Sequence, residues 1–277
     1  MIDLHTHSTY SDGSFTPVEI LKAAKDIGLT AVALTDHNTV LGLPEFISNA
    51  KTMGINAVPG GELTTEYDGN ELHLILLFIK EESYNTINEF IFKYRELKRI
   101  GNLQMIERLR SAGYDICYDD IEANTPTGNI NRTHVAKELV KKGYFSTTAE
   151  VFDSILSEKF SFYVPTQKMN TADAIRFGVS IDAIPILAHP LDNLSESDAK
   201  RIIPELKSAG LIGMEVAHSS YDKRKNELAI KIATDNSLLF SGGSDFHGTV
   251  KQGIYLGVGK GDMNVPDDYY HKLINFK

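Results

Sequence analysis

Histidines and carboxylates recur in this sequence at spacings that suit metal binding. Two motifs, His5-Thr6-His7 and Asp245-Phe246-His247, each place two donor residues two positions apart. In a strand this spacing directs both side chains to the same side. Each motif alone has an ordinary alternative, because such residues can also be polar side chains at a strand end. The nine histidines are His5, His7, His37, His73, His134, His189, His218, His247 and His271.

The elements that position these residues are short apolar runs that alternate with amphipathic segments. Five histidines stand at or just past the end of such a run, whereas His73 lies near the start of its run. Continuous apolar runs are typical of strands buried on both faces, as in a parallel sheet. Alternation in units of roughly 30 residues predicts right-handed βαβ connections and an α/β sheet or barrel. The seven predicted strands are Met1–His5, Ala31–Thr35, Asn56–Glu62, Leu72–Ile79, Ile184–Ala188, Leu211–Val216 and Leu238–Gly242.

Helix start signals separate several of these strands. Thr16 is a candidate N-cap with Pro17 at the first helical position and Glu19 placed to complete a capping box. Similar starts are predicted at Thr171 and at Ser195.

One interval breaks the alternation, because no strong strand signal appears between the fourth and fifth predicted strands. Helical patterns occupy it instead, over Tyr84–Ala112, Asn131–Lys142 and Thr147–Ser157. We therefore expect a barrel domain formed by residues 1–96 and 168–277, with a helical insertion domain at 97–167 that contributes to substrate binding.

Three carboxylates join the histidines at the predicted strand ends. Asp12 could be a simple turn residue before Gly13, and Glu62 or His73 taken singly would be unremarkable. Together the donors exceed what one tetrahedral zinc needs and suffice for two or three ions. In a barrel the C-terminal ends of the strands meet at one rim, where active sites assemble. The predicted metal ligands are His5, His7, Asp12, His37, Glu62, His73, His189, Asp245 and His247.

In order and spacing, these motifs resemble those of the PHP (polymerase and histidinol phosphatase) superfamily. The resemblance rests on His5-x-His7, Asp12, Thr35-Asp36-His37, Glu62, His73, Ala188-His189-Pro190 and Ser244-Asp245-Phe246-His247. It implies a distorted (β/α)7 barrel with a di- or trinuclear metal site. It also implies that His5, His7, Glu62 and Asp245 hold one ion, that Asp12, His37 and His247 serve a second, and that Glu62, His73 and His189 serve a third.

The insertion is similar to that of PHP phosphoesterases that act on nucleotides, because Arg132-Thr133-His134 resembles an Arg-x-His segment of that subgroup. The resemblance implies that Arg132, His134 and His218 bind the substrate phosphate. Without this resemblance, Arg132 and His134 would be interpreted as solvent-exposed residues at the start of a helix. Three residues depart from the usual pattern without removing a ligand, namely Asn38, Thr133 and Leu77.

The expected function is hydrolysis of a phosphate monoester of a nucleotide, such as the 3′-phosphate of a nucleoside 3′,5′-bisphosphate, or of a short oligonucleotide. Divalent ions (Mn, Fe or Zn) lower the pKa of a bridging water to about 7, and the resulting hydroxide attacks phosphorus. Asp36, next to a predicted ligand, is expected to orient an imidazole. The alternatives are a small-metabolite phosphatase such as histidinol-phosphatase, a metal-dependent C–N hydrolase and a non-catalytic metal-binding module.

Composition is consistent with this expectation. The chain has 277 residues, a net charge of −9 and 42% hydrophobic residues, which is ordinary globular composition. Its one cysteine, Cys117, excludes an intramolecular disulfide and a thiolate zinc cage. The acidic charge argues against duplex DNA as a partner. No spanning run and no signal sequence is visible, so we expect a cytoplasmic enzyme without membrane contact; the oligomeric state stays open.

Overall fold

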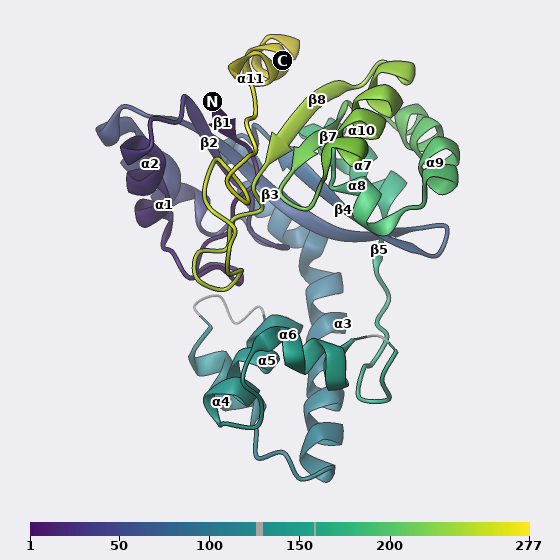
Figure 1. The fold of residues 1–277 in the computed structure, drawn as a ribbon. Helices are drawn as coiled ribbons and strands as arrows, with labels where there is room; N and C mark the ends of the chain where they lie inside the picture. Colours follow the sequence, from purple (N-terminus) through teal and green to yellow (C-terminus); the bar gives the residue numbers. More distant parts are fainter. Residues whose placement is uncertain (126–129, 158) are drawn as a thin grey trace.

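The computed structural model describes residues 1–125, 130–157 and 159–277. Strands and helices alternate, except at the hairpin of β3 and β4 and in a helical segment between β4 and β5 (Figure 1). In chain order the elements are β1 (Ile2–Asp3), α1 (Pro17–Asp26), β2 (Ala31–Leu34), α2 (Leu43–Met53), β3 (Asn56–Tyr67), β4 (Asn70–Leu77), η1 (Glu81–Ser83), α3 (Tyr84–Ser111), α4 (Tyr118–Ala123), α5 (Arg132–Lys141), α6 (Thr148–Val151), η2 (Phe152–Leu156), β5 (Met169–Asn170), α7 (Thr171–Ser180), β6 (Ile184–Ala188), α8 (Pro190–Asn193), α9 (Glu196–Ser208), β7 (Gly213–His218), α10 (Lys223–Asp235), β8 (Leu239–Gly243) and α11 (Asp267–Phe276).

All seven predicted strands occur, and they form one nearly closed, barrel-shaped sheet in the order β1-β2-β3-β4-β6-β7-β8. The edges meet where Leu4 N donates to Gly242 O at 3.1 Å and Asp245 N donates to His5 O at 2.9 Å. The short strand β5, which the sequence analysis did not predict, pairs with β3.

Strand β4 corrects the expectation of an all-parallel sheet, because it runs antiparallel to both β3 and β6. Strand β3 continues past Glu62 to Tyr67, and a two-residue turn with positive φ at Asp68 and Gly69 leads directly into β4. Asp-Gly suits such a turn because both residues tolerate positive φ. The reversal explains His73, since the start of an antiparallel strand lies at the rim where the parallel strands end.

The predicted helix starts are confirmed at two of three positions. Thr16 forms the complete capping box with Glu19, and Ser195 caps α9 by accepting from Asp198 N. The third prediction was wrong by one residue, because Asn170 rather than Thr171 caps α7. An asparagine oxygen is at least as good a cap as a threonine hydroxyl.

Two apolar layers hold the barrel. One lies inside the sheet, where residues such as Leu4, Val58 and Ile186 meet Leu273 of α11. The other lies between the sheet and the surrounding helices α1, α2, α7, α9 and α10. Helix α11 covers one end of the barrel, and the helical segment extends from the opposite end (Figure 1).

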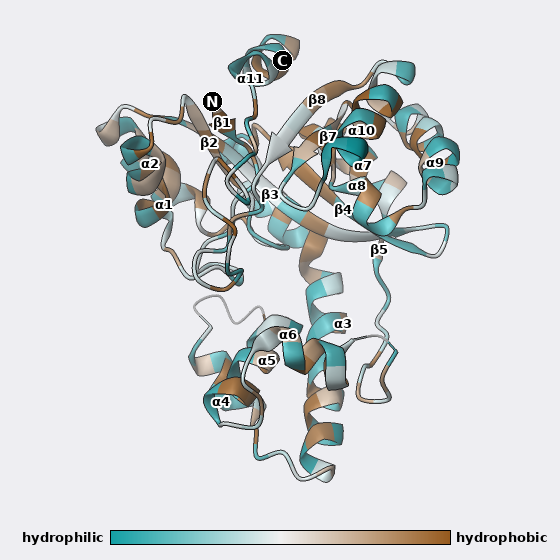
Figure 2. Cartoon of the chain, viewed as in Figure 1, coloured by the Kyte–Doolittle hydropathy of each residue, from teal (hydrophilic) through white to brown (hydrophobic). Residues whose placement is uncertain are grey.

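The helical segment has a hydrophobic cluster of its own, which includes Met105, Leu109, Val135 and Leu156. Figure 2 shows hydrophobic stretches along α3, from the end that adjoins the sheet to its far end, and on α4. Helix α3 connects the outer core of the barrel with the cluster of the insertion, because Ile87 belongs to the first and Leu109 to the second. No helix among the described residues is both long and apolar enough to cross a bilayer.

Candidate metal centre

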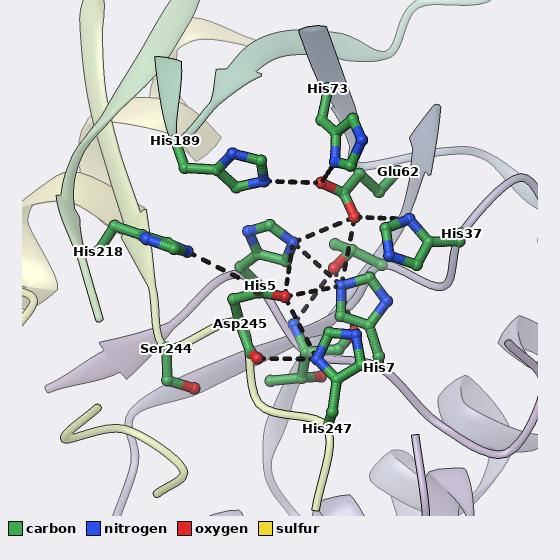
Figure 3. A network of polar contacts seen from close by, with 12 residues as sticks. His5, His7, His37, Glu62, His73, His189, His218, Ser244, Asp245 and His247 are labelled. Carbon is green, nitrogen blue, oxygen red and sulfur yellow. Dashed lines mark hydrogen bonds and ion pairs between the residues drawn. The ribbon is translucent and has the colours of Figure 1, made fainter. Parts of the chain in front are cut away.

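The nine predicted ligands lie together at the end of the barrel that faces the helical segment. They come from different elements: His5 and His7 follow β1, Glu62 lies in β3, His73 lies in β4 and His189 follows β6. His37 and His73 are partly exposed, and the other seven are buried. Figure 3 labels all of them except Asp12 and shows the labelled side chains pointing toward one another around a shared centre.

Glu62 is at the middle of this cluster, with no solvent exposure. Each of its two oxygens faces a separate set of imidazoles (Figure 3). Oε2 lies 3.3 Å from His5 Nε2, 3.3 Å from His7 Nε2 and 2.9 Å from His37 Nδ1, and Oε1 lies 2.9 Å from His73 Nδ1 and 3.2 Å from His189 Nε2. A carboxylate so placed can bridge two ions.

The two remaining carboxylates flank Glu62. Asp245 Oδ1 lies 3.2 Å from His7 Nε2 and 3.6 Å from His5 Nε2. Asp12 Oδ1 lies 3.3 Å from His247 Nε2 and 4.0 Å from His37 Nε2. The predicted ligands thus form one continuous cluster.

The close packing of imidazoles and carboxylates shifts their pKa values in opposite directions. Burial alone would lower the pKa of His7, but hydrogen bonds to Asp245 and Glu62 raise it to about 9. Glu62 in turn raises the pKa of His73 to about 9 against the effect of burial. Burial, together with the charge of His7, lowers the pKa of His247 to about 4. The pKa of Glu62 falls well below its usual range, because the surrounding histidines outweigh its burial.

These residues fit divalent cations. His5 Nε2 and His7 Nε2 point at each other across 3.0 Å, and His7 Nδ1 and Asp12 Oδ1 are buried without a hydrogen-bond partner among the described residues. Uncompensated buried polar atoms are costly and are expected where an ion binds. Five overlapping groups have ligand atoms within 4.8 Å of one another: His7/Asp12/His37/His247, His5/His7/Asp245, His5/Glu62/His189, His37/Glu62/His73 and His5/Glu215/His218.

Glu215 is a buried carboxylate that the sequence analysis did not single out. It lies 3.0 Å from His5 Nδ1 and accepts the backbone N–H of His189 at 2.8 Å. The first contact holds a proton on Nδ1 and turns Nε2 of His5 toward the cluster. A carboxylate within the apolar strand run Gly213-Met214-Glu215-Val216 was the signal that could have revealed it.

Asp36 has different contacts from those predicted. Its carboxylate accepts hydrogen bonds from Ser8 N at 2.7 Å, Ser8 Oγ at 2.7 Å and Ser11 Oγ at 2.6 Å. Asp36 therefore fixes the turn that carries Asp12, and it does not orient an imidazole as predicted. Gly13 closes this turn so tightly that a Cβ there would lie 2.1 Å from His7 O, which excludes any other residue without a shift.

Asn38, one of the three departures from the family pattern, is explained by its contacts. Its Oδ1 accepts Thr64 N and its Nδ2 donates to Thr64 Oγ1, both at 3.1 Å. An ionised aspartate could accept but not donate here. The amide fixes the segment after His37 against the strand that carries Glu62.

The helical segment contacts the cluster through the start of α5. Asn131 Nδ2 donates to Asp12 Oδ2 at 3.0 Å, and Lys137 Nζ donates to Asp12 O at 2.9 Å. Asn131 also caps α5, and its own N–H donates to His134 Nδ1 at 3.1 Å. One oxygen of Asp12 is thereby held by the insertion, while the other faces His247.

The three predicted substrate-binding residues occupy different places. Arg132 lines a cavity between the cluster and the insertion, with its guanidinium carbon 4.9 Å from the centroid of the Tyr163 ring. His218 lines a second cavity on the other side, together with Lys251, whose ammonium contacts Asp245. His134 is not among the residues that line either cavity. No sequence signal pointed to Lys251, which lies in a loop.

Comparison with known proteins agrees with this geometry. The chain is 30% identical over 246 residues to a 5′-3′ exoribonuclease of Haemophilus influenzae, covering 88% of this chain and 89% of the relative. It is 30% identical over 249 residues to a 3′,5′-nucleoside bisphosphate phosphatase of Chromobacterium violaceum, covering 89% and 87%.

A crystal structure of a Bifidobacterium adolescentis protein described as a metal-dependent phosphoesterase superposes with a TM-score of 0.89. The two sequences are 28% identical, and the match covers 99% of this chain and 95% of that one. A sequence profile of the PHP domain matches residues 3–156. The chain therefore belongs to the PHP domain family, which confirms the α/β barrel and the metal-dependent phosphoesterase class predicted from the sequence.

Proposed function

We propose that this protein hydrolyses a phosphate monoester of a nucleotide, such as the 3′-phosphate of a nucleoside 3′,5′-bisphosphate, or a short 5′-phosphorylated oligonucleotide. The observation that carries this proposal is the cluster of nine nitrogen and oxygen ligands around Glu62, six of which line two cavities. The named activities of the H. influenzae and C. violaceum relatives support a nucleotide or RNA substrate.

The nine predicted ligands would hold two or three divalent ions. Mixed nitrogen and oxygen ligation without sulfur suits Mn²⁺, Fe²⁺ or Zn²⁺. When bound, such ions lower the pKa of water and offset the charge that develops on a phosphoryl group. Glu62 is placed to be shared between ions, because its two oxygens face different histidines.

His218 is proposed to donate a hydrogen bond, or a proton, to a substrate oxygen. His218 Nδ1 lies 2.7 Å from Ser220 Oγ, which itself donates to Asp192, and 3.2 Å from the backbone nitrogen of Ser220, so Ser220 fixes the ring with Nε2 turned toward the cavity. Nε2 is buried at the cavity and has no hydrogen-bond partner among the described residues. Its nearest carboxylate oxygen, Asp245 Oδ2, lies 3.7 Å away, and a phosphoryl or leaving-group oxygen would supply a closer partner.

Arg132 is proposed to bind a phosphate oxygen pair, since a guanidinium matches phosphate in a planar, bidentate contact. His134 was predicted to share this task, but its ring nitrogen Nδ1 accepts from Asn131. We therefore propose that His134 acts indirectly, by fixing the start of α5 and so the position of Arg132. On this view residues 97–167 form the insertion domain of the barrel 1–96 and 168–277 and supply substrate contacts to it.

A phosphate-release screen tests the proposal. Protein reconstituted separately with Mn²⁺, Fe²⁺ and Zn²⁺ is incubated with adenosine 3′,5′-bisphosphate, AMP, histidinol phosphate and a short 5′-phosphorylated RNA. We expect kcat/KM on the bisphosphate or the RNA to exceed that on histidinol phosphate by at least about tenfold. A preference for histidinol phosphate, or turnover of an amide in place of every phosphate, would contradict the proposal.

Replacing Arg132 by alanine is expected to weaken substrate binding more than it slows turnover. KM should rise by about tenfold, with kcat changed only a few-fold, because the lost contact acts on substrate and transition state alike. Steady-state kinetics on the best substrate of the screen measures both values. Arg176→Ala, an exposed arginine of α7 paired with Asp173, is the control and should leave both unchanged. A selective fall in kcat in Arg132→Ala would instead place Arg132 at the reacting phosphate.

A further inference from the structure

The cavity beside Arg132 contains more positive charge than one phosphate requires. Among the described residues, four cationic side chains and two carboxylates line it. Asp12 belongs to the metal cluster, and Glu71 Oε2 pairs with one of the four cations, Lys168 Nζ, at 2.5 Å, so these two carboxylates do not balance the four cations. The protein as a whole has a net charge of −9, so this cavity is more positive than the average of the protein's surface. The four cationic residues are Arg95, Lys98, Arg132 and Lys168.

Helix α3 delivers two of these cations. Tyr94, Arg95, Lys98, Asn102 and Met105 lie on one stripe of the helix, with the three-to-four-residue spacing that keeps side chains on one face. This stripe forms one wall of the cavity. Asn102 fixes the wall to the segment before α5, because its Nδ2 donates to Ile130 O at 2.8 Å.

Lys98 and Arg95 are both partly buried, and no described carboxylate lies within 4.0 Å of the charged nitrogens of either. Burial lowers the pKa of Lys98, the negative charge of Asp12 partly opposes this, and the positive charges of Arg132 and Lys168 lower it further. Like charges gathered in a partly buried cavity destabilise the fold unless an anion neutralises them.

The cavity is continuous with the metal cluster, because Asp12, His37 and His73 line it as well. The second cavity shares His37, Glu71 and His73 but has His218 and Lys251 instead of the α3 cations. A substrate with one phosphate at the cluster would therefore extend under the insertion toward α3. Tyr94, Phe152 and Tyr163 provide aromatic surface along that path.

We propose that Arg95 and Lys98 of α3 form an anion subsite for a second phosphate of the substrate, the one that is not cleaved. This inference rests on the proposed function and deepens it, since it assigns the residues that select a substrate with two phosphates. The second phosphate can be the terminal group of a nucleoside bisphosphate or the first internucleotide phosphate of a short RNA.

The test compares Lys98→Gln and Arg95→Gln with Arg99→Gln. Arg99 is exposed on the same helix, and its Nε lies 3.3 Å from Glu96 Oε2. It does not line the cavity, so it is a matched control. Three substrates are used: adenosine 3′,5′-bisphosphate, a 5′-phosphorylated dinucleotide and p-nitrophenyl phosphate, which has only the reacting phosphate. We expect kcat/KM to fall by about tenfold or more, chiefly through KM, on at least one of the two nucleotides, and by less than about twofold on p-nitrophenyl phosphate. The nucleotide that loses activity identifies the source of the second phosphate, and Lys98→Arg should restore it.

A binding measurement keeps this inference separate from the proposed function. Calorimetry of adenosine 3′,5′-bisphosphate with chelator-treated protein should show a Kd about tenfold weaker in Lys98→Gln and unchanged in Arg99→Gln. If the wild-type protein hydrolyses none of the phosphates, the proposed function fails, and this affinity difference still decides the subsite. Equal losses on all three substrates, or an unchanged Kd in Lys98→Gln, would overturn the subsite.

Discussion

Glu62→Gln is expected to lower kcat/KM for phosphate release by at least about 10³-fold, because the substitution removes the charge that the cluster shares between ions. Glu62 is fully buried and lies within 3.3 Å of five imidazoles. The amide keeps the shape of the side chain but offers only one acceptor oxygen. We expect less bound metal per protein by elemental analysis, together with the loss of turnover.

Glu66→Gln is the matched control, since Glu66 is an exposed residue of the same strand β3. It should retain activity and metal content. His37→Ala and Asp245→Ala should also abolish turnover, whereas His271→Ala, in exposed α11, should not. Full activity in Glu62→Gln with unchanged metal content would refute the assignment of the metal centre. A thermal unfolding curve of the chelated variant separates this result from simple misfolding.

Removing divalent ions with a chelator is expected to abolish turnover and to lower the thermal midpoint. Ions present at about 1,000 times their dissociation constant stabilise the folded protein by about 4 kcal/mol per independent site. For a chain of this size that corresponds to a fall in Tm of roughly 8–16 °C. Scanning fluorimetry before and after chelation, and after adding Mn²⁺ back, measures the effect. Purified protein that is active and free of bound ions would contradict the metal centre.

The pH dependence follows from the same histidines. The pKa values of His7 and His73 are raised from 6.5 to about 9, so chelated protein carries protons that an ion must displace. Metal affinity should therefore increase as pH rises from 6.5 to 9, by about tenfold per pH unit for each proton displaced. The stabilisation that these charged imidazoles give the chelated protein is fully present below pH 6.5 and is lost as pH rises through about 9.

Scanning fluorimetry between pH 6 and 9 tests both directions. The Tm of chelated protein should fall over this range by at least about 2 °C, because one kcal/mol corresponds to roughly that shift. The Tm difference between loaded and chelated protein should grow over the same range. A constant difference would show that protons and ions do not compete for these imidazoles.

The strands and the metal-binding side chains at their ends could be predicted from the sequence, because a buried strand appears in it as a run of apolar residues. The direction of a strand leaves no such pattern. An antiparallel β4 and a parallel one have the same apolar pattern, and only the Asp68-Gly69 turn indicates a hairpin. The sequence could thus identify His73 as a donor without explaining why it stands at the start of its strand.

Contacts between distant segments were less predictable still. Glu215 and His5 are 210 positions apart, and Asn131 and Asp12 are 119 positions apart. The residues around Asn131 predict a helix cap, but they give no sign that the same side chain also donates to Asp12 of the barrel. From the sequence alone, Lys98 would be taken for one more charged residue on the exposed face of a helix. Only the fold places it in the same cavity as Arg132 and Lys168.

Helix α3 also constrains how the two parts of the chain can move. Its 28 residues correspond to about 42 Å of continuous helix, and the proposed boundary at residue 97 falls within it. A Cβ on Gly101 would lie 2.4 Å from Thr166 Cγ2, so the returning chain presses directly against the helix. Swivelling the insertion would require bending this strut, because that junction offers no slack linker. We therefore expect the space between α3 and the metal cluster to keep its width when substrate binds, and the enzyme to discriminate substrates by their length.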